Sequence, residues 1–171
     1  MTNELDRRQR FRQCVDDNAE SIFRVAFRLT GARDMAQELV QETYLNAWAN
    51  LESLKDESKM RGWVFAILRN QYTKLKRKLP PLASVDYEVQ AKDESFEREN
   101  REQQQAMVQL AIQQLDDEHK FPLLLVSMEG MTTEAAGEVL GIPKGTILSR
   151  LHRARQKLRN ILEPQLRAQN S

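Results

Sequence analysis

Hydrophobic residues between positions 6 and 79 recur at steps of three and four, the spacing that lines one face of an α-helix. The pattern breaks at Gly31 and again across 55–61, a polar segment that ends at Gly62. We therefore predict three or four packed helices, with 55–61 as a loop. The apolar stripes contain Phe11, Val15, Ile22, Val25, Ala26 and Leu29; Ala36, Leu39, Val40, Tyr44, Ala47, Trp48 and Leu51; and Val64, Ile67, Leu68, Leu75 and Leu79.

This helical pattern stops at Pro80 and Pro81, and the segment that follows is polar and acidic. Such a composition is typical of a linker, although good helix formers from Glu97 favour the start of another helix. Helical periodicity resumes at Met107. We predict an all-α protein with two small helical domains joined by a flexible linker. The predicted boundaries are 1–80 for the first domain, 81–104 for the linker and 105–171 for the second domain.

The second domain contains the pattern of a helix, a tight turn and another helix between residues 132 and 155. Gly141 stands where the apolar periodicity of the first of these helices stops, as a C-terminal glycine in the left-handed conformation would. Pro143 cannot continue that helix but can open the next one. Thr132 suits the N-cap of the first helix. A helix-turn-helix is predicted, a motif that commonly reads DNA.

The second helix of this motif carries many cations. Six Lys or Arg residues and no acids lie between Lys144 and Arg159. Their mutual repulsion is unfavourable in a solvated helix but favourable beside phosphates. The alternative is an ordinary basic amphipathic helix in a helical hairpin. The candidate DNA contacts are Lys144, Thr146, Ser149, Arg150, His152, Arg153, Gln156 and Arg159.

A second basic face is predicted on the last helix of the first domain. Residues 61–79 again contain six Lys or Arg residues and no acids. A basic face that includes amide, hydroxyl and aromatic groups suits phosphates and unstacked bases, although it could also be a solvated charged face. The candidate contacts are Trp63, Arg69, Asn70, Thr73, Lys74, Lys76 and Arg77.

The overall composition argues against several other classes of protein, namely disulfide-rich, metal-binding, membrane-inserted and magnesium-dependent ones. The 171 residues have a net charge of only +1, so the information lies in how charge is sorted along the chain. One cysteine, Cys14, and two scattered histidines predict neither a disulfide framework nor a metal site, and no cofactor is expected. A polar N-terminus and the lack of a long apolar run predict a cytoplasmic protein without membrane insertion. Neither basic block contains an acid that could hold magnesium, so we do not predict an enzyme.

Three blocks together resemble bacterial sigma factors of the extracytoplasmic-function group: 36–48 (AQELVQETYLNAW), 61–70 (RGWVFAILRN) and 141–155 (GIPKGTILSRLHRAR). They occur in that group's order. The resemblance implies a non-enzymatic initiation subunit that binds core RNA polymerase, places it on a promoter and helps to open the minus-ten DNA. It assigns the first domain to minus-ten recognition and the second to the minus-thirty-five element. It also implies a monomer that is controlled by an anti-sigma factor.

The resemblance further assigns polymerase docking to Glu38, Gln41, Glu42 and Trp48, although Trp48 could instead belong to the core. It assigns base capture to the 55–61 loop. Two departures stand out, because Lys74 replaces a frequent acid and Gly137 a usual alanine. The rival function is an autonomous dimeric helix-turn-helix regulator, which leaves the basic face of the first domain unexplained.

Overall fold

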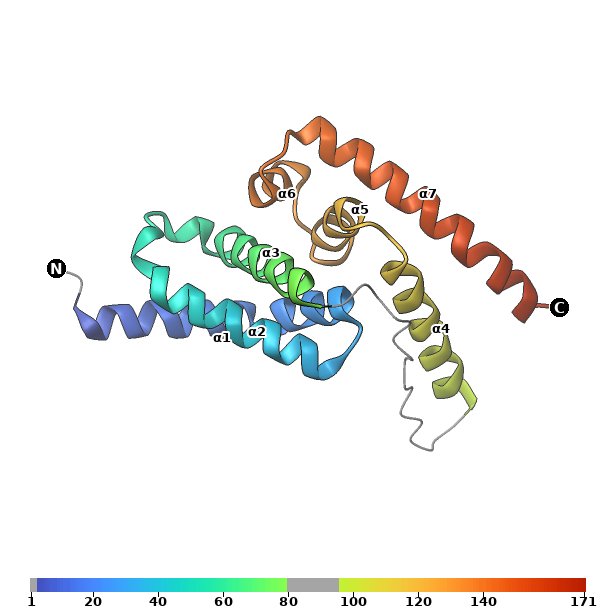
Figure 1. Cartoon of the computed structure of the whole chain (residues 1–171), viewed down its shortest axis with the longest axis horizontal. Helices are drawn as coiled ribbons and strands as arrows, with labels where there is room; N and C mark the ends of the chain where they lie inside the picture. The colour runs from blue at the N-terminus through green and yellow to red at the C-terminus, as the bar shows by residue number, and fades with distance from the viewer. Residues whose placement is uncertain (1–2, 80–95) are drawn as a thin grey trace.

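The computed structural model describes residues 3–79 and 96–171, and every regular element in these two ranges is helical. Figure 1 shows two groups of helices that lie side by side, with α7 along one edge. The first group consists of α1 (Glu4–Thr30), α2 (Arg33–Asn50), the short turns η1 (Leu51–Ser53) and η2 (Glu57–Lys59), and α3 (Met60–Lys78). The second consists of α4 (Phe96–Gln113), α5 (Asp117–Pro122), the π-helical η3 (Leu123–Met128), α6 (Thr133–Leu140) and α7 (Lys144–Gln169).

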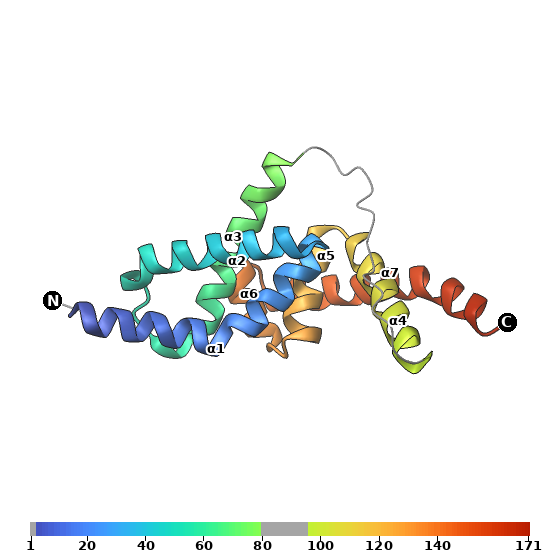
Figure 2. The same cartoon turned by 90° about the horizontal axis from the view of Figure 1, so that it is seen from below.

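In the first group, α1 and α2 form a long helical hairpin, and α3 crosses it (Figure 2). The N-cap Asn3 accepts a hydrogen bond from the backbone N–H of Leu5 at the start of α1. Gly31 ends α1 in the left-handed conformation at φ 71°, which permits the sharp reversal into α2. The predicted apolar stripes supply the core, including the fully buried Ile22 and Leu68.

In the second group, the helix-turn-helix has the geometry that the sequence predicts. The hydroxyl of Thr132 accepts a hydrogen bond from the N–H of Ala135, and Gly141 ends α6 at φ 66°. Pro143 stands at the N-cap of α7. A Cβ atom on Gly137 would lie 2.7 Å from the carbonyl oxygen of Ile142, so the turn folds back against this glycine. That close approach explains why a glycine stands at this position.

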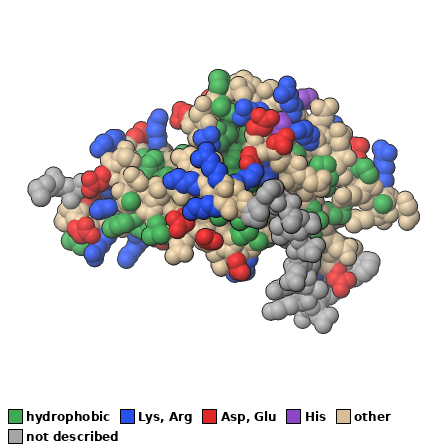
Figure 3. All heavy atoms as spheres, in the orientation of Figure 1, with side chains coloured by type: hydrophobic (Ala, Val, Ile, Leu, Met, Phe, Trp, Pro, Cys, Tyr) green, Lys and Arg blue, Asp and Glu red, His purple; other side chains and the backbone are tan. Residues whose placement is uncertain are grey.

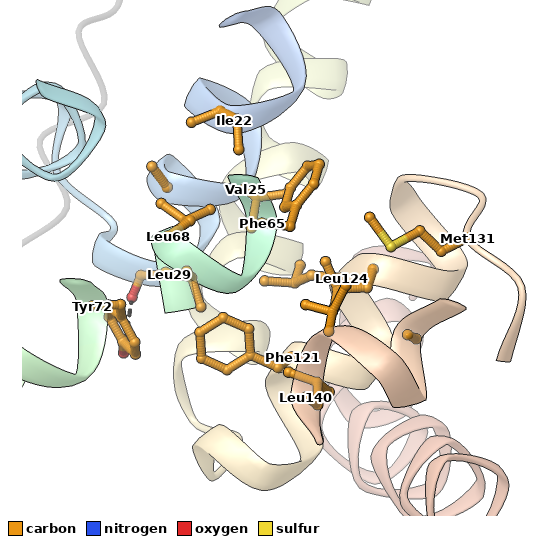
Figure 4. Packing of buried hydrophobic residues seen from close by; sticks show 14 of the residues in the cluster. Ile22, Val25, Leu29, Phe65, Leu68, Tyr72, Phe121, Leu124, Met131 and Leu140 are labelled. Carbon is orange, nitrogen blue, oxygen red and sulfur yellow. Dashed lines mark hydrogen bonds between the residues drawn. The ribbon is translucent and has the colours of Figure 1, made fainter. Parts of the chain in front are cut away.

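The two groups share one hydrophobic core rather than packing only through polar surfaces (Figure 4). Phe121 of α5 meets the ring of Tyr72 of α3 edge-on, with centroids 5.6 Å apart. Phe65 of α3 and Leu124 of η3 are nearly inaccessible to solvent and belong to this cluster. Burial of aromatic and aliphatic groups therefore holds the groups together.

Two element boundaries differ from the sequence-based expectation. The 55–61 segment contains the turn η2, and α3 already begins at Met60, because buried Met60 extends the apolar face of that helix. Helix α4 begins at Phe96, so the end of the predicted linker is helical, in accordance with the helix formers from Glu97. The remainder of that linker, and the predictions that concern it, lie outside the described residues. Among those described, no helix has the length and apolarity to cross a bilayer.

Candidate nucleic-acid and polymerase interfaces

Helix α7 presents the first predicted DNA-reading surface. Its apolar stripe of Ile147, Leu151 and Ala154 is buried against the rest of the domain. The opposite side is directed to solvent, as the sequence predicts. Most of the candidate contacts there are exposed, namely Lys144, Ser149, His152, Arg153, Gln156 and Arg159, while Thr146 and Arg150 are half-buried.

Two of the cations among these contacts form ion pairs within the domain. The Nζ atom of Lys144 lies 2.5 Å from a carboxylate oxygen of Glu134 on α6. This ammonium is the main cause of the lowered pKa of Glu134, about 2. Arg150 lies 3.9 Å from Glu118 of α5, whereas the structure records no such ion pair for Arg153 or Arg159. Within the described residues, Arg153 and Arg159 are therefore the cations on this side that are most available to a ligand.

Helix α3 presents the second predicted surface. Val64, Ile67 and Leu68 are buried, and the other side carries the exposed residues Asn70, Thr73, Lys74, Lys76 and Arg77. Trp63 and Arg69 are half-buried at its edge. Figure 3 shows Lys and Arg side chains gathered over the end of α3, beside acidic side chains over α5.

Acids of the second domain pair with cations at both ends of α3 and with Arg24 of α1. Glu129, which follows η3, has a side chain only 2% exposed and receives hydrogen bonds from Arg24 at 2.8 Å and from Arg61 at 3.3 Å. Burial opposes its ionisation, but hydrogen bonds from Arg24, Ser21 and Arg61 outweigh burial and hold the pKa of Glu129 below its usual value. At the other end of α3, Lys76 contacts Asp117 of α5 at 2.7 Å. We call these contacts the interdomain clasp.

The clasp was not foreseen from the sequence. Its acids come from α5 and from the turn after η3, at sequence distances of 41 to 105 residues from their partners. Local patterns do not report contacts over such separations, so no signal in the periodicity identifies Glu129.

A hollow of about 530 Å³ lies where the two domains meet. The 53–59 segment and the start of α3 line one side, and Met131, Ala135, Glu138 and Val139 line the other. Trp63 borders it from α3. The segment to which base capture was assigned therefore faces the first helix of the helix-turn-helix.

The four predicted docking residues lie on α2, but only three of them share an exposed side of that helix. Glu38, Gln41 and Glu42 are exposed on the same side of the helix. Leu45 is not among the predicted docking residues, but it continues this row along the helix, and it is 57% exposed. Trp48 turns toward α1, where its ring packs against Phe11 with centroids 5.2 Å apart and lies under the Arg7 guanidinium. Trp48 thus contributes to packing within the first domain.

One group of metal-ligand type exists among the described residues. Asp116, Glu118 and His119 place possible ligand atoms within 4.8 Å of one another. However, Nζ of Lys157 lies 3.4 Å from both Asp116 and the Nδ1 atom of His119. This ammonium already supplies the positive charge at that point, which disfavours a divalent cation.

Two family models match the chain. The model of sigma-70 region 2 matches residues 14–79, and that of sigma-70 region 4 matches residues 105–158. A curated relative, the "ECF RNA polymerase sigma factor EcfG" of Rhodopseudomonas palustris, is 35% identical over 80% of this chain and 76% of its own. The chain belongs to the extracytoplasmic-function group of RNA polymerase sigma factors. Members of this family are transcription initiation factors.

Two further comparisons extend this assignment. The sigma factor SigE of Mycolicibacterium smegmatis is 30% identical over 88% of this chain, which spans only 60% of that relative. The sigma factor RpoE of Bartonella quintana, solved in complex with the anti-sigma factor NepR, superposes with a TM-score of 0.72 at 25% identity and covers 90% of this chain and 96% of that one. The likeness covers both domains and therefore extends to the order and packing of the helices.

Proposed function

We propose that this sigma factor binds core RNA polymerase, directs it to specific promoters and assists in opening the minus-ten DNA. The observation that carries the proposal is the presence of two acid-free basic faces on separate domains, on α3 and on α7. A single reader would suffice for a duplex-binding regulator. The rival, an autonomous dimeric regulator, gives no role to the face on α3 or to the exposed row of Glu38, Gln41 and Glu42.

The two faces suit different forms of DNA. Helix α7 exposes a polar, cationic side beyond a tight turn, as a helix that enters the major groove requires. Helix α3 combines the aromatic ring of Trp63 with the Asn70 amide and several cations, which suits an unpaired strand whose bases are accessible. We assign the minus-thirty-five duplex to α7 and the minus-ten strand to α3.

Run-off transcription with core polymerase tests the function as a whole. Templates would carry candidate promoters, beginning with the region upstream of the protein's own gene. We expect transcripts with a defined start only when the sigma factor is present. Tight, sequence-specific duplex binding by the free protein, without any transcript from the holoenzyme, would favour the dimeric regulator.

Single substitutions test the division of labour. Arg153→Ala should weaken minus-thirty-five binding by roughly 1 to 3 kcal/mol if it reads a base, while the binding of a minus-ten single strand is retained. Arg167→Ala is the matched control, because Arg167 is exposed on the same helix but lies far from its start. Asn70→Ala should show the reverse pattern. Equal losses on both DNA forms for either variant would contradict the assignment.

Polymerase docking is assigned to the exposed row on α2. Glu38→Lys combined with Gln41→Ala should weaken core binding while helical content and unfolding temperature are retained, because both side chains are exposed. Glu20→Lys, a charge reversal at a 93% exposed side chain of α1, is the control. Unchanged core affinity in the double variant would reject this docking surface.

Control by an anti-sigma factor is supported by the solved relative, which was crystallised with one. We propose that such a partner binds this chain and hides the docking and DNA-reading surfaces. A candidate partner should abolish run-off transcription in a stoichiometric manner and compete with core polymerase in a binding assay. A candidate that binds the sigma factor without displacing the polymerase would not be the proposed inhibitor.

A further inference from the structure

Leu148 is an apolar exception on the DNA-facing side of α7. Its side chain is 49% exposed, whereas Ile147 and Leu151 on either side of it in the sequence are buried. At helical spacing its neighbours are Lys144 one turn before and His152 one turn after, and both are exposed. Leu148 thus lies at the flank of the side that we assign to minus-thirty-five recognition, in one row with Lys144 and His152, and about half of its side chain is left outside the core.

Gly145 lies one turn before Leu148, at the start of the same helix. A Cβ atom at this position would meet no atom within 4 Å apart from its chain neighbours and the backbone of its own helix. Glycine is unfavourable in a helix, and nothing within the described protein explains why a side chain is missing here. A ligand that approaches the backbone closely would explain it. The open space before Leu148 therefore allows that side chain to reach a surface that lies against α7.

The chemistry of leucine limits what it could recognise in that position. Leucine has no hydrogen-bond donor or acceptor, so it cannot read the polar groups of a base edge. In the major groove, the one apolar group that base pairs present is the 5-methyl group of thymine. Contact with that methyl group would remove apolar surface from water on both partners.

We propose that Leu148 is a specificity-determining residue that reads the 5-methyl group of a thymine in the minus-thirty-five element. The inference deepens the function proposed above and rests on it. Gly145 allows the close approach, and the cations on the same side hold the phosphates. Leu148 then discriminates thymine from the other bases without a hydrogen bond.

Replacing thymine by deoxyuridine tests this directly, because the two bases differ only in the methyl group. Duplexes would first be selected from a random pool by the holoenzyme, and each thymine of the selected minus-thirty-five element would then be replaced in turn. For one position or two adjacent positions, we expect deoxyuridine to weaken binding of the wild-type holoenzyme about three- to fivefold, the effect of one methyl group. With Leu148→Ala, the same replacement should have no effect.

Leu166→Ala is the matched control, since Leu166 is a similarly exposed leucine on α7 near its other end. This variant should keep the full response to deoxyuridine. Gly145→Ala should weaken all selected duplexes alike while the unfolding temperature does not fall. If Leu148→Ala responded to deoxyuridine as the wild type does, the inference would be wrong. If the wild-type holoenzyme selected no duplex at all, the proposed function would fail instead.

Discussion

Glu129 gives the sharpest test of how the two domains are held together. Its carboxylate is almost fully buried and receives hydrogen bonds from Arg24 and Arg61 of the first domain. Glu129→Gln removes the charge but keeps the size of the side chain and one carbonyl acceptor. The variant therefore tests the clasp without creating a cavity.

The expected loss follows from the exposure of the partners. Removing one member of a fully buried ion pair typically costs roughly 3 to 5 kcal/mol, because the other charge is left without solvent. Here the Arg24 and Arg61 side chains are 45% and 40% exposed, so water partly replaces the lost carboxylate. We therefore expect Glu129→Gln to lower the free energy of unfolding by about 1 to 2 kcal/mol.

The assay is urea unfolding followed by circular dichroism, with Glu20→Gln as the control. Glu20 lies 3.8 Å from the same Arg24, but it is exposed and belongs to the first domain. Its substitution should change the free energy of unfolding by less than about 0.5 kcal/mol. Equal losses for the two variants would show that Arg24 contributes through its charge alone and that the clasp does not stabilise the pairing of the domains.

The pH dependence supplies a second readout. Because the pKa of Glu129 is lowered in the folded protein, its stabilisation is complete above the unfolded value of 4.5 and is lost as the pH falls through the lower folded value. The difference between wild type and Glu129→Gln should therefore be constant at neutral pH and shrink below about pH 4.5. A difference that grew on acidification would contradict a carboxylate stabilised by arginine.

Three other substitutions or reactions test individual features. Gly137→Ala should lower the free energy of unfolding by roughly 1 to 3 kcal/mol, measured by urea unfolding, because the new Cβ would collide with the Ile142 carbonyl oxygen; an unchanged value would mean that the turn can move. Thr132→Ala should cost about 1 kcal/mol in the same assay through loss of the N-cap, whereas Thr132→Ser should not. Burial raises the pKa of Cys14 to about 11, so iodoacetamide should label it at pH 8 much more slowly in the native than in the urea-unfolded protein, and equal rates would show that its helix opens readily.

The helices were predictable from sequence because each carries a strong local signal. The stripe around Val64 and Leu68 and the turn at Gly141 depend only on neighbouring residues, and both are present as predicted. The start of α3 was placed too late, since η2 has no periodicity of its own. Trp48 could not be assigned, because a tryptophan in an apolar stripe suits both packing and docking until the position of Phe11 is known.

The site was less predictable where it depends on contacts between the domains. Sequence patterns identify the cations of α3 but not which of them are neutralised, since Asp117 approaches Lys76 only in the folded chain. Leu148 is not among the DNA contacts that the sequence predicts, and it is not part of the predicted apolar stripe either. Its exposure becomes evident only when the direction of α7 relative to the rest of its domain is fixed.

The hydrophobic core that joins the two domains weakens the binding of any partner that requires the domains to separate. A partner that requires the domains apart binds only the separated fraction of molecules, so its apparent dissociation constant rises as that fraction falls. Each 1.4 kcal/mol of additional pairing energy between Phe121, Leu124 and their neighbours on α3 would weaken such a partner about tenfold. A partner that accepts the paired arrangement would be unaffected. Substitutions in this core, although their side chains are buried, would thus shift the competition between partners that need the domains apart and partners that accept them paired.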